Sequence, residues 1–114
     1  MEISTQKTDD TCIVTVKGEV DASSSIRLDA TLQEIIEQQC KKILVNFQFL
    51  TYISSAGIGV FTSRLEDCQH NHIKLVLFGM NHDIFNVFKI LGLDQLLTIV
   101  STEEEAKRIV HDEI

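Results

Sequence analysis

The segment Ile43-Leu44-Val45-Asn46-Phe47 places apolar side chains on both sides of an extended chain. A strand of this kind is covered on both faces, which is typical of the centre of a sheet flanked by helices. Residues 73–78 form a second apolar run, which Gly79 closes. The two runs favour an α/β fold with a largely parallel sheet.

Three weaker strand signals accompany these runs. Residues 12–17 alternate, with Cys12, Val14 and Val16 on one face, and Gly18 is expected to end that strand. We expect residues 2–6 to pair with it as a hairpin. Residues 96–100 predict one more short strand.

Amphipathic spacing predicts helices between these strands. The first two cover residues 24–39 and 56–69, and the first is capped by Ser23 or Ser24. Asn81 opens a third helix that Gly92 stops, and Ser101 to Glu104 has the spacing of a capping box for a last helix. The expected buried positions are Leu28, Leu32, Ile35 and Ile36, then Ile58, Phe61, Leu65 and Cys68, then Ile84, Val87, Phe88 and Leu91, then Ala106, Ile109 and Val110.

The predicted order is therefore ββαβαβαβα. It describes a single α/β domain over residues 1–114, with four to five strands and about four helices. Partners of such sheets usually bind at the carboxyl ends of the strands. The turn Ser54-Ser55 follows a central strand and lies at that end.

Composition excludes several classes of partner. The net charge is −7 and the ten Lys and Arg residues are scattered, which disfavours nucleic acids and anionic membranes. No stretch approaches the roughly 20 apolar residues of a membrane span, and the first ten residues do not resemble a secretory signal. The three separated cysteines indicate buried, reduced thiols in a cytoplasmic protein. An acidic surface leaves a basic protein partner as one possibility.

Signals for catalysis, metals and cofactors are weak. The nucleophile motif G-x-S-x-G is absent, and His70 and His72 follow the predicted helix at its far end, about 20 Å from Ser55. These two histidines lack a third ligand at a known spacing and indicate a solvated loop. Gly57-Ile58-Gly59 lacks the rest of a phosphate-binding loop, so close helix packing explains it better.

The serine turn itself has two interpretations. Ser54 and Ser55 are N-capping residues, or one of them accepts a phosphate. The first N–H groups of a helix and its macrodipole would favour an added phosphate there. Spacing alone does not decide between these readings.

Three features resemble bacterial anti-sigma factor antagonists, the small single-domain members of the STAS superfamily. They extend over nearly the whole chain. The first is Gly18-Glu19-Val20-Asp21, and the second leads from Ile43-Leu44-Val45-Asn46 through Leu50, Tyr52 and Ile53 to Ser54-Ser55-Ala56-Gly57-Ile58-Gly59-Val60. The third is the tail with Val87, Leu91, Gly92, Leu93, Leu97, Ile99 and Glu105-Ala106.

The resemblance implies a STAS fold and a switch without catalytic activity. The unphosphorylated antagonist binds an anti-sigma factor, often itself a serine kinase of the histidine-kinase-like ATPase fold, and thereby releases a sigma factor. The kinase phosphorylates the antagonist, and a PP2C-type phosphatase restores binding. Motif position makes Ser55 the acceptor and Ser54 a second candidate. Ser54 and Asn46 stand where many members carry Asp.

The expected contact surface is the start of the second helix and the neighbouring loop. Between Val60 and Phe61, Val60 is expected to point outward as a partner contact. The residues of this surface are Asp21, Ser23, Ser54, Ser55, Ala56, Gly57, Ile58, Val60 and Arg64. The alternative functions are a scaffold or accessory STAS domain of a signalling complex or transporter, and a small enzyme with Ser55 as nucleophile.

Overall fold

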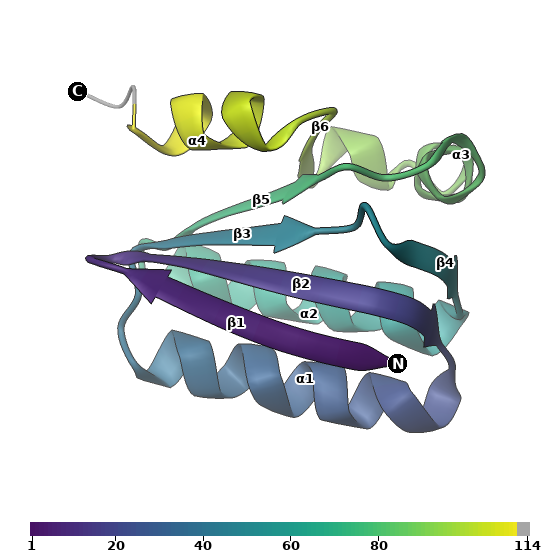
Figure 1. Ribbon diagram of the computed structural model, residues 1–114, viewed down its shortest axis with the longest axis horizontal. Helices are drawn as coiled ribbons and strands as arrows, with labels where there is room; N and C mark the ends of the chain where they lie inside the picture. Colours follow the sequence, from purple (N-terminus) through teal and green to yellow (C-terminus); the bar gives the residue numbers. More distant parts are fainter. Residues whose placement is uncertain (112–114) are drawn as a thin grey trace.

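The computed structural model describes residues 1–111, which form one sheet with helices on both faces (Figure 1). The strands are β1 (Glu2–Thr8), β2 (Thr11–Val20), β3 (Lys42–Asn46), β4 (Leu50–Ile53), β5 (Lys74–Phe78) and β6 (Thr98–Val100). The helices are α1 (Ala22–Glu37), α2 (Ser55–His70), α3 (His82–Ile90) and α4 (Glu103–His111), with a 3-10 turn η1 (Leu93–Gln95). The predicted α/β class with a mostly parallel sheet is confirmed, but residues 1–111 form six strands and not four to five, because β4 adds a strand to the predicted order ββαβαβαβα.

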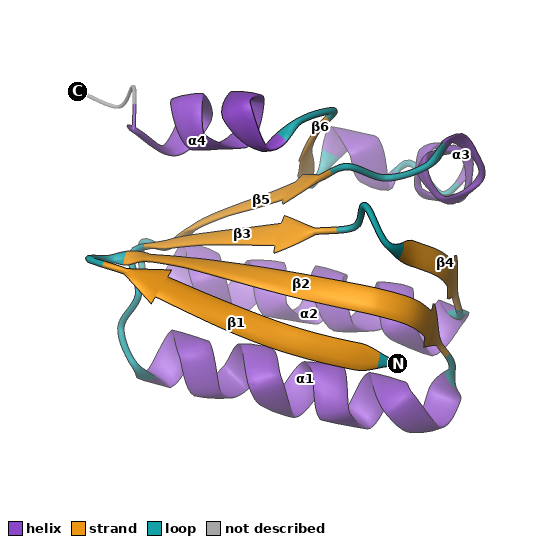
Figure 2. Ribbon diagram, viewed as in Figure 1, coloured by secondary structure: helices purple, strands orange, loops and turns teal. Residues whose placement is uncertain are grey.

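The sheet has the order β1-β2-β3-β5-β6, and β4 pairs with the end of β2. Among the strand pairs within residues 1–111, only the β1–β2 hairpin is antiparallel. Helices α1 and α2 lie side by side on one face, α4 lies on the other, and α3 lies beyond the strand ends (Figure 2). The carboxyl ends of β2, β4 and β5 lead into α1, α2 and α3, respectively.

The central strand β3 is buried on both faces, as predicted. Ile43 and Val45 pack in the core beneath α1 and α2, whereas Leu44 packs against α4 with Ala106 and Val110. This alternation explains why the segment is apolar at nearly every position.

Two strand predictions need correction. Gly18 does not end β2, since the strand continues to Val20 through a register shift, with Gly18 at φ +86°. The short strand β4 was not predicted, because only Leu50 and Ile53 at its ends are buried. In a strand with one buried face, buried and exposed residues alternate. The buried–exposed–exposed–buried pattern of β4 lacks this alternation.

The caps of two helices also differ from the prediction. Asp21, not Ser23 or Ser24, caps α1, and its carboxylate accepts from the Ser24 N–H at 2.8 Å. Thr102 caps α4, and its hydroxyl accepts from the Glu105 N–H at 3.1 Å, one residue later than the predicted box. Thr102 directly follows the predicted Ser101, whereas Asp21 lies two residues before Ser23; both are residue types that commonly cap helices.

The predicted helix stripes are buried in part. Ile84 and Phe88 of α3 are buried, but Val87 and Leu91 are 41% and 56% exposed because α3 packs on the end of the sheet along one narrow face. Ile109 is 38% exposed. Gly92 ends the helical segment with φ +74°, as expected for a glycine stop.

All three cysteines are buried and unpaired. Burial raises the pKa of Cys12 and of Cys68 to about 11, which keeps these thiols protonated and unreactive. Among the described helices, none is both long and apolar enough to span a membrane.

Candidate partner-binding site

Two helices begin side by side at the carboxyl end of the sheet. Strands β2 and β4 run parallel with Val20 opposite Ile53, and each leads directly into a helix. The Ser54 N–H donates to the Val20 carbonyl at 2.8 Å, which ties the start of α2 to the end of β2. The positive ends of two helix dipoles therefore face the same part of the surface.

Ser54 and Ser55 occupy different positions at the start of α2. Ser54 is the N-cap, partly buried, and its hydroxyl accepts from the Gly57 N–H at 3.2 Å. Ser55 is the first helical residue and is exposed. Its hydroxyl makes no hydrogen bond with any residue that the structure describes. Of the two hydroxyls, that of Ser55 is free to react or to contact a partner.

Asp21 holds an ordered carboxylate at the start of α1. It accepts from the Ser24 N–H at 2.8 Å, from the Ser24 hydroxyl at 3.0 Å and from the Ser23 hydroxyl at 3.1 Å. The backbone and hydroxyl hydrogen bonds from Ser24, followed by that from Ser23, lower the pKa of Asp21 below its usual value. Both Asp21 and Ser23 are exposed, so a fixed negative charge lies on the expected contact surface.

The two glycines of α2 have different surroundings. A Cβ on Gly57 would lie 2.8 Å from Cγ1 of both Ile53 and Val20, whereas a Cβ on Gly59 would meet nothing within 4 Å. Gly57 thus permits close packing of the helix start on β2 and β4, as the packing interpretation predicted. Gly59 leaves an open place on the helix surface.

Alanine at these two positions is expected to change stability in opposite directions. Gly57→Ala should destabilise the fold by about 1–3 kcal/mol through overpacking against Ile53 and Val20. Gly59→Ala should stabilise it by roughly 0.5–1 kcal/mol, because alanine favours the helix and its methyl group meets no neighbour. Urea unfolding of both variants tests this, and a stabilised Gly57→Ala variant would contradict the packing account.

The remaining expected contact residues differ in exposure. Ala56 is exposed, but Gly57 is buried, and Ile58 and Val60 are only 6% and 8% exposed. As expected, Val60 is more exposed than Phe61, whose exposed fraction is 1%. Even so, Val60 offers little surface to a partner.

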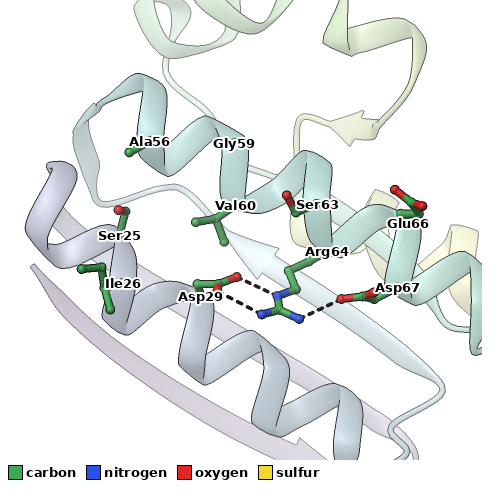
Figure 3. Close-up of a pocket in the computed structure, with 10 residues that line it drawn as sticks. All are labelled: Ser25, Ile26, Asp29, Ala56, Gly59, Val60, Ser63, Arg64, Glu66 and Asp67. Carbon is green, nitrogen blue, oxygen red and sulfur yellow. Dashed lines mark hydrogen bonds and ion pairs between the residues drawn. The ribbon is translucent and has the colours of Figure 1, made fainter.

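Arg64 is engaged within the protein and is not free for a partner. Its Nε and Nη2 donate to the two oxygens of Asp29 at 2.7 and 3.0 Å, and its Nη1 donates to Asp67 at 2.7 Å (Figure 3). This bidentate pair ties α1 to α2, 35 residues apart in the chain. No pattern of neighbouring residues in the sequence predicts the ion pair between Arg64 and Asp29.

Sequence reasoning also missed two exposed side chains near the serines. Ile26 on α1 is 72% exposed and Tyr52 on β4 is 50% exposed. The sequence did contain a signal for the exposure of Ile26, because this apolar residue lies outside the buried stripe of α1 that includes Leu28.

The possible metal ligands His70 and His72 lie apart from the serine turn within residues 1–111. No group of three or more His, Cys, Asp or Glu side chains within residues 1–111 is placed to hold a metal ion. His70 ends α2 and His72 follows it, so both lie at the opposite end of the helix from Ser55.

Fold and surface together define a small α/β domain with paired helix starts and an exposed serine at one end of the sheet. The STAS domain family model matches residues 2–106, and the chain belongs to this family. An anti-sigma-B factor antagonist of Listeria monocytogenes is 29% identical over 105 residues, covering 92% of this chain and 91% of the relative.

Several solved structures share the fold, among them the following three. The anti-sigma factor antagonist SpoIIAA in its unphosphorylated form has a TM-score of 0.85 at 23% identity and covers 99% of both chains. A putative anti-sigma factor antagonist from Thermotoga maritima has a TM-score of 0.89 at 19% identity, covering 95% of this chain and 93% of that one. SpoIIAA also has a structure in its phosphorylated form, with a TM-score of 0.76 at 24% identity over 96% of this chain and all of that one (100%).

Proposed function

We propose that this protein is an anti-sigma factor antagonist that binds its partner through the paired starts of α1 and α2 and is switched off by a phosphate on Ser55. The observation that carries the proposal is the exposed, unbonded hydroxyl of Ser55 at the first position of α2. The names of the curated relatives support the general role.

The surroundings of Ser55 suit a reversible phosphate. Unpaired N–H groups and the dipole of α2 stabilise an anion at this place by roughly 0.3–1 kcal/mol. The phosphate adds about −1.5 to −2 charge near the fixed carboxylate of Asp21. A partner surface that fits the unmodified helix starts then meets extra bulk and negative charge, and binding is lost.

Ser55 is favoured over Ser54 for a physical reason. The Ser54 hydroxyl caps α2 through its bond with the Gly57 N–H. Esterifying that oxygen would disturb a cap worth about 0.5–2 kcal/mol. The Ser55 hydroxyl makes no capping hydrogen bond, so its phosphorylation leaves the cap of α2 intact.

The proposed partner is an anti-sigma factor with serine kinase activity of the histidine-kinase-like ATPase fold, and a PP2C-type phosphatase removes the phosphate. The protein itself acts as a binding module and not as an enzyme. A serine nucleophile needs a base within hydrogen-bond reach, and none of the described residues bonds to the Ser55 hydroxyl. The scaffold or accessory role stays a prediction.

Mapping the phosphate by mass spectrometry tests the assignment. The protein, incubated with ATP and an extract of the source cells, is expected to carry one phosphate on Ser55. Ser55→Ala should remove this phosphate, whereas Ser54→Asp should keep it, because Asp also caps a helix well. Phosphate confined to Ser54 or to another residue would contradict the proposed switch.

A further inference from the structure

An open groove of about 660 Å³ runs between α1 and α2, beginning beside the acceptor serine. Ile26 and Asp29 line it from α1, and Ala56, Gly59 and Glu66 line it from α2 (Figure 3). Because Ala56 follows Ser55 directly, a partner that reaches Ser55 lies at the mouth of this groove.

The end of the groove nearest Ser55 is lined by small residues and Ile26, and the one hydroxyl there, that of Ser25, donates to a backbone carbonyl of α1 at 2.7 Å. Ile26 exposes 72% of its surface on the α1 side. On the α2 side, Ala56 carries only a methyl group and Gly59 has open space where a side chain would stand. Small residues allow a partner backbone to approach closely, and the exposed isoleucine gains by being covered.

The far end of the groove is acidic. Asp29, Glu66 and Asp67 line the groove together with the single cation Arg64, which leaves a net charge of −2 along the lining. Of these three acids, Asp29 and Asp67 form ion pairs with Arg64. Arg64 has a side chain only 16% exposed and is fully engaged with Asp29 and Asp67. Glu66 is exposed and forms no ion pair with the described residues. Since Arg64 fixes both walls, the groove exists before any partner binds.

Resting on the proposed function, we propose that this groove receives a segment of the anti-sigma factor in which a small apolar side chain is followed by a lysine or arginine. The apolar part covers Ile26 beside Gly59, and the cation meets Glu66 and the acidic end. The charges also set the orientation. The helix starts attract the phosphates of the kinase's nucleotide toward Ser55, while the acidic end attracts its basic side chain.

Two matched pairs of variants test the groove. Glu66→Lys and Glu34→Lys each change the net charge from −7 to −5, but only Glu66 lines the groove. Ile26→Ser and Ile90→Ser each remove an isoleucine more than 70% exposed, at 72% and 74%, but Ile90 lies on α3. The tagged variants, wild type and Ser55→Asp are used to retain proteins from the source cells, and retained anti-sigma factor is quantified by mass spectrometry.

Glu66→Lys and Ile26→Ser are expected to bind the retained anti-sigma factor about tenfold more weakly or worse than wild type, and their controls to bind like wild type. Melting temperatures measured in parallel establish that each variant is folded. If both groove variants bind like wild type while Ser55→Asp does not, the groove proposal fails and the switch stands. Equal losses in the control variants would also overturn it. If wild type retains no anti-sigma factor, or Ser55→Asp retains it equally, the proposed function fails and the groove proposal fails with it.

Discussion

Ser55→Asp is expected to weaken binding to the anti-sigma factor by roughly a hundredfold or more, whereas Ser55→Ala binds like wild type. The Asp carboxylate places a negative charge at the exposed first position of α2, and the Ser54–Val20 hydrogen bond ties this helix start to the end of β2 that leads into the second carboxylate, Asp21. A partner packed there would have to desolvate both charges. Isothermal titration calorimetry with the purified anti-sigma factor gives both affinities.

Ser54→Asp is the matched control for this charge. It adds the same carboxylate one residue earlier, where the Ser54 side chain turns inward to cap the Gly57 N–H. Asp caps helices about as well as Ser, so its charge would be directed at the helix N–H groups and away from the partner. We expect Ser54→Asp to retain most of the binding. Equal losses in both variants would show that net negative charge, and not the position of Ser55, controls the complex.

The largest expected effect on stability is that of Phe47→Ala, at about 3–5 kcal/mol. Phe47 is fully buried, at 0% exposure, where the chain leaves β3. Its ring lies 5.3 Å from that of Phe61 on α2 and 6.1 Å, edge-on, from that of Phe88 on α3. Removing it leaves a cavity where these elements meet the sheet, and urea unfolding measures the loss.

Phe49→Ala is the control in the same turn. Phe49 is 53% exposed, and its ring contacts the ammonium group of Lys17 at 5.2 Å from the ring centroid. Its truncation should cost no more than about 1 kcal/mol, the size of an exposed cation–π contact. Similar losses for Phe47 and Phe49 would contradict the assignment of Phe47 to the core.

The sequence predicts best where a local pattern reports burial directly. The apolar run around Val45 identified the central strand because both of its faces are covered. The residues that cap the helices were harder to predict. Before α4, for example, Ser101-x-x-Glu104 and Thr102-x-x-Glu105 both have the spacing of a capping box. The sequence around them does not say which starts the helix; in the fold, β6 ends at Val100 and Thr102 takes the cap.

The candidate site was predictable in its position but not in its contacts. We expected the serine turn to follow the central strand, but it follows the short strand β4. Because β4 runs parallel to the end of β2, the turn still lies at the carboxyl ends of the strands, as expected. The pairing of Arg64 with Asp29 depends on how α1 and α2 pack, which no local pattern encodes. For the same reason Arg64 was expected to meet a partner, although the structure engages its guanidinium internally.

The most direct test compares the anti-sigma factor's affinity for the unmodified protein with its affinity for protein carrying phosphoserine at position 55. We expect tight binding of the unmodified form, a loss of roughly a hundredfold or more on phosphorylation, and recovery after treatment with a serine phosphatase. Equal affinities for the two forms would contradict the proposal that Ser55 is the switch.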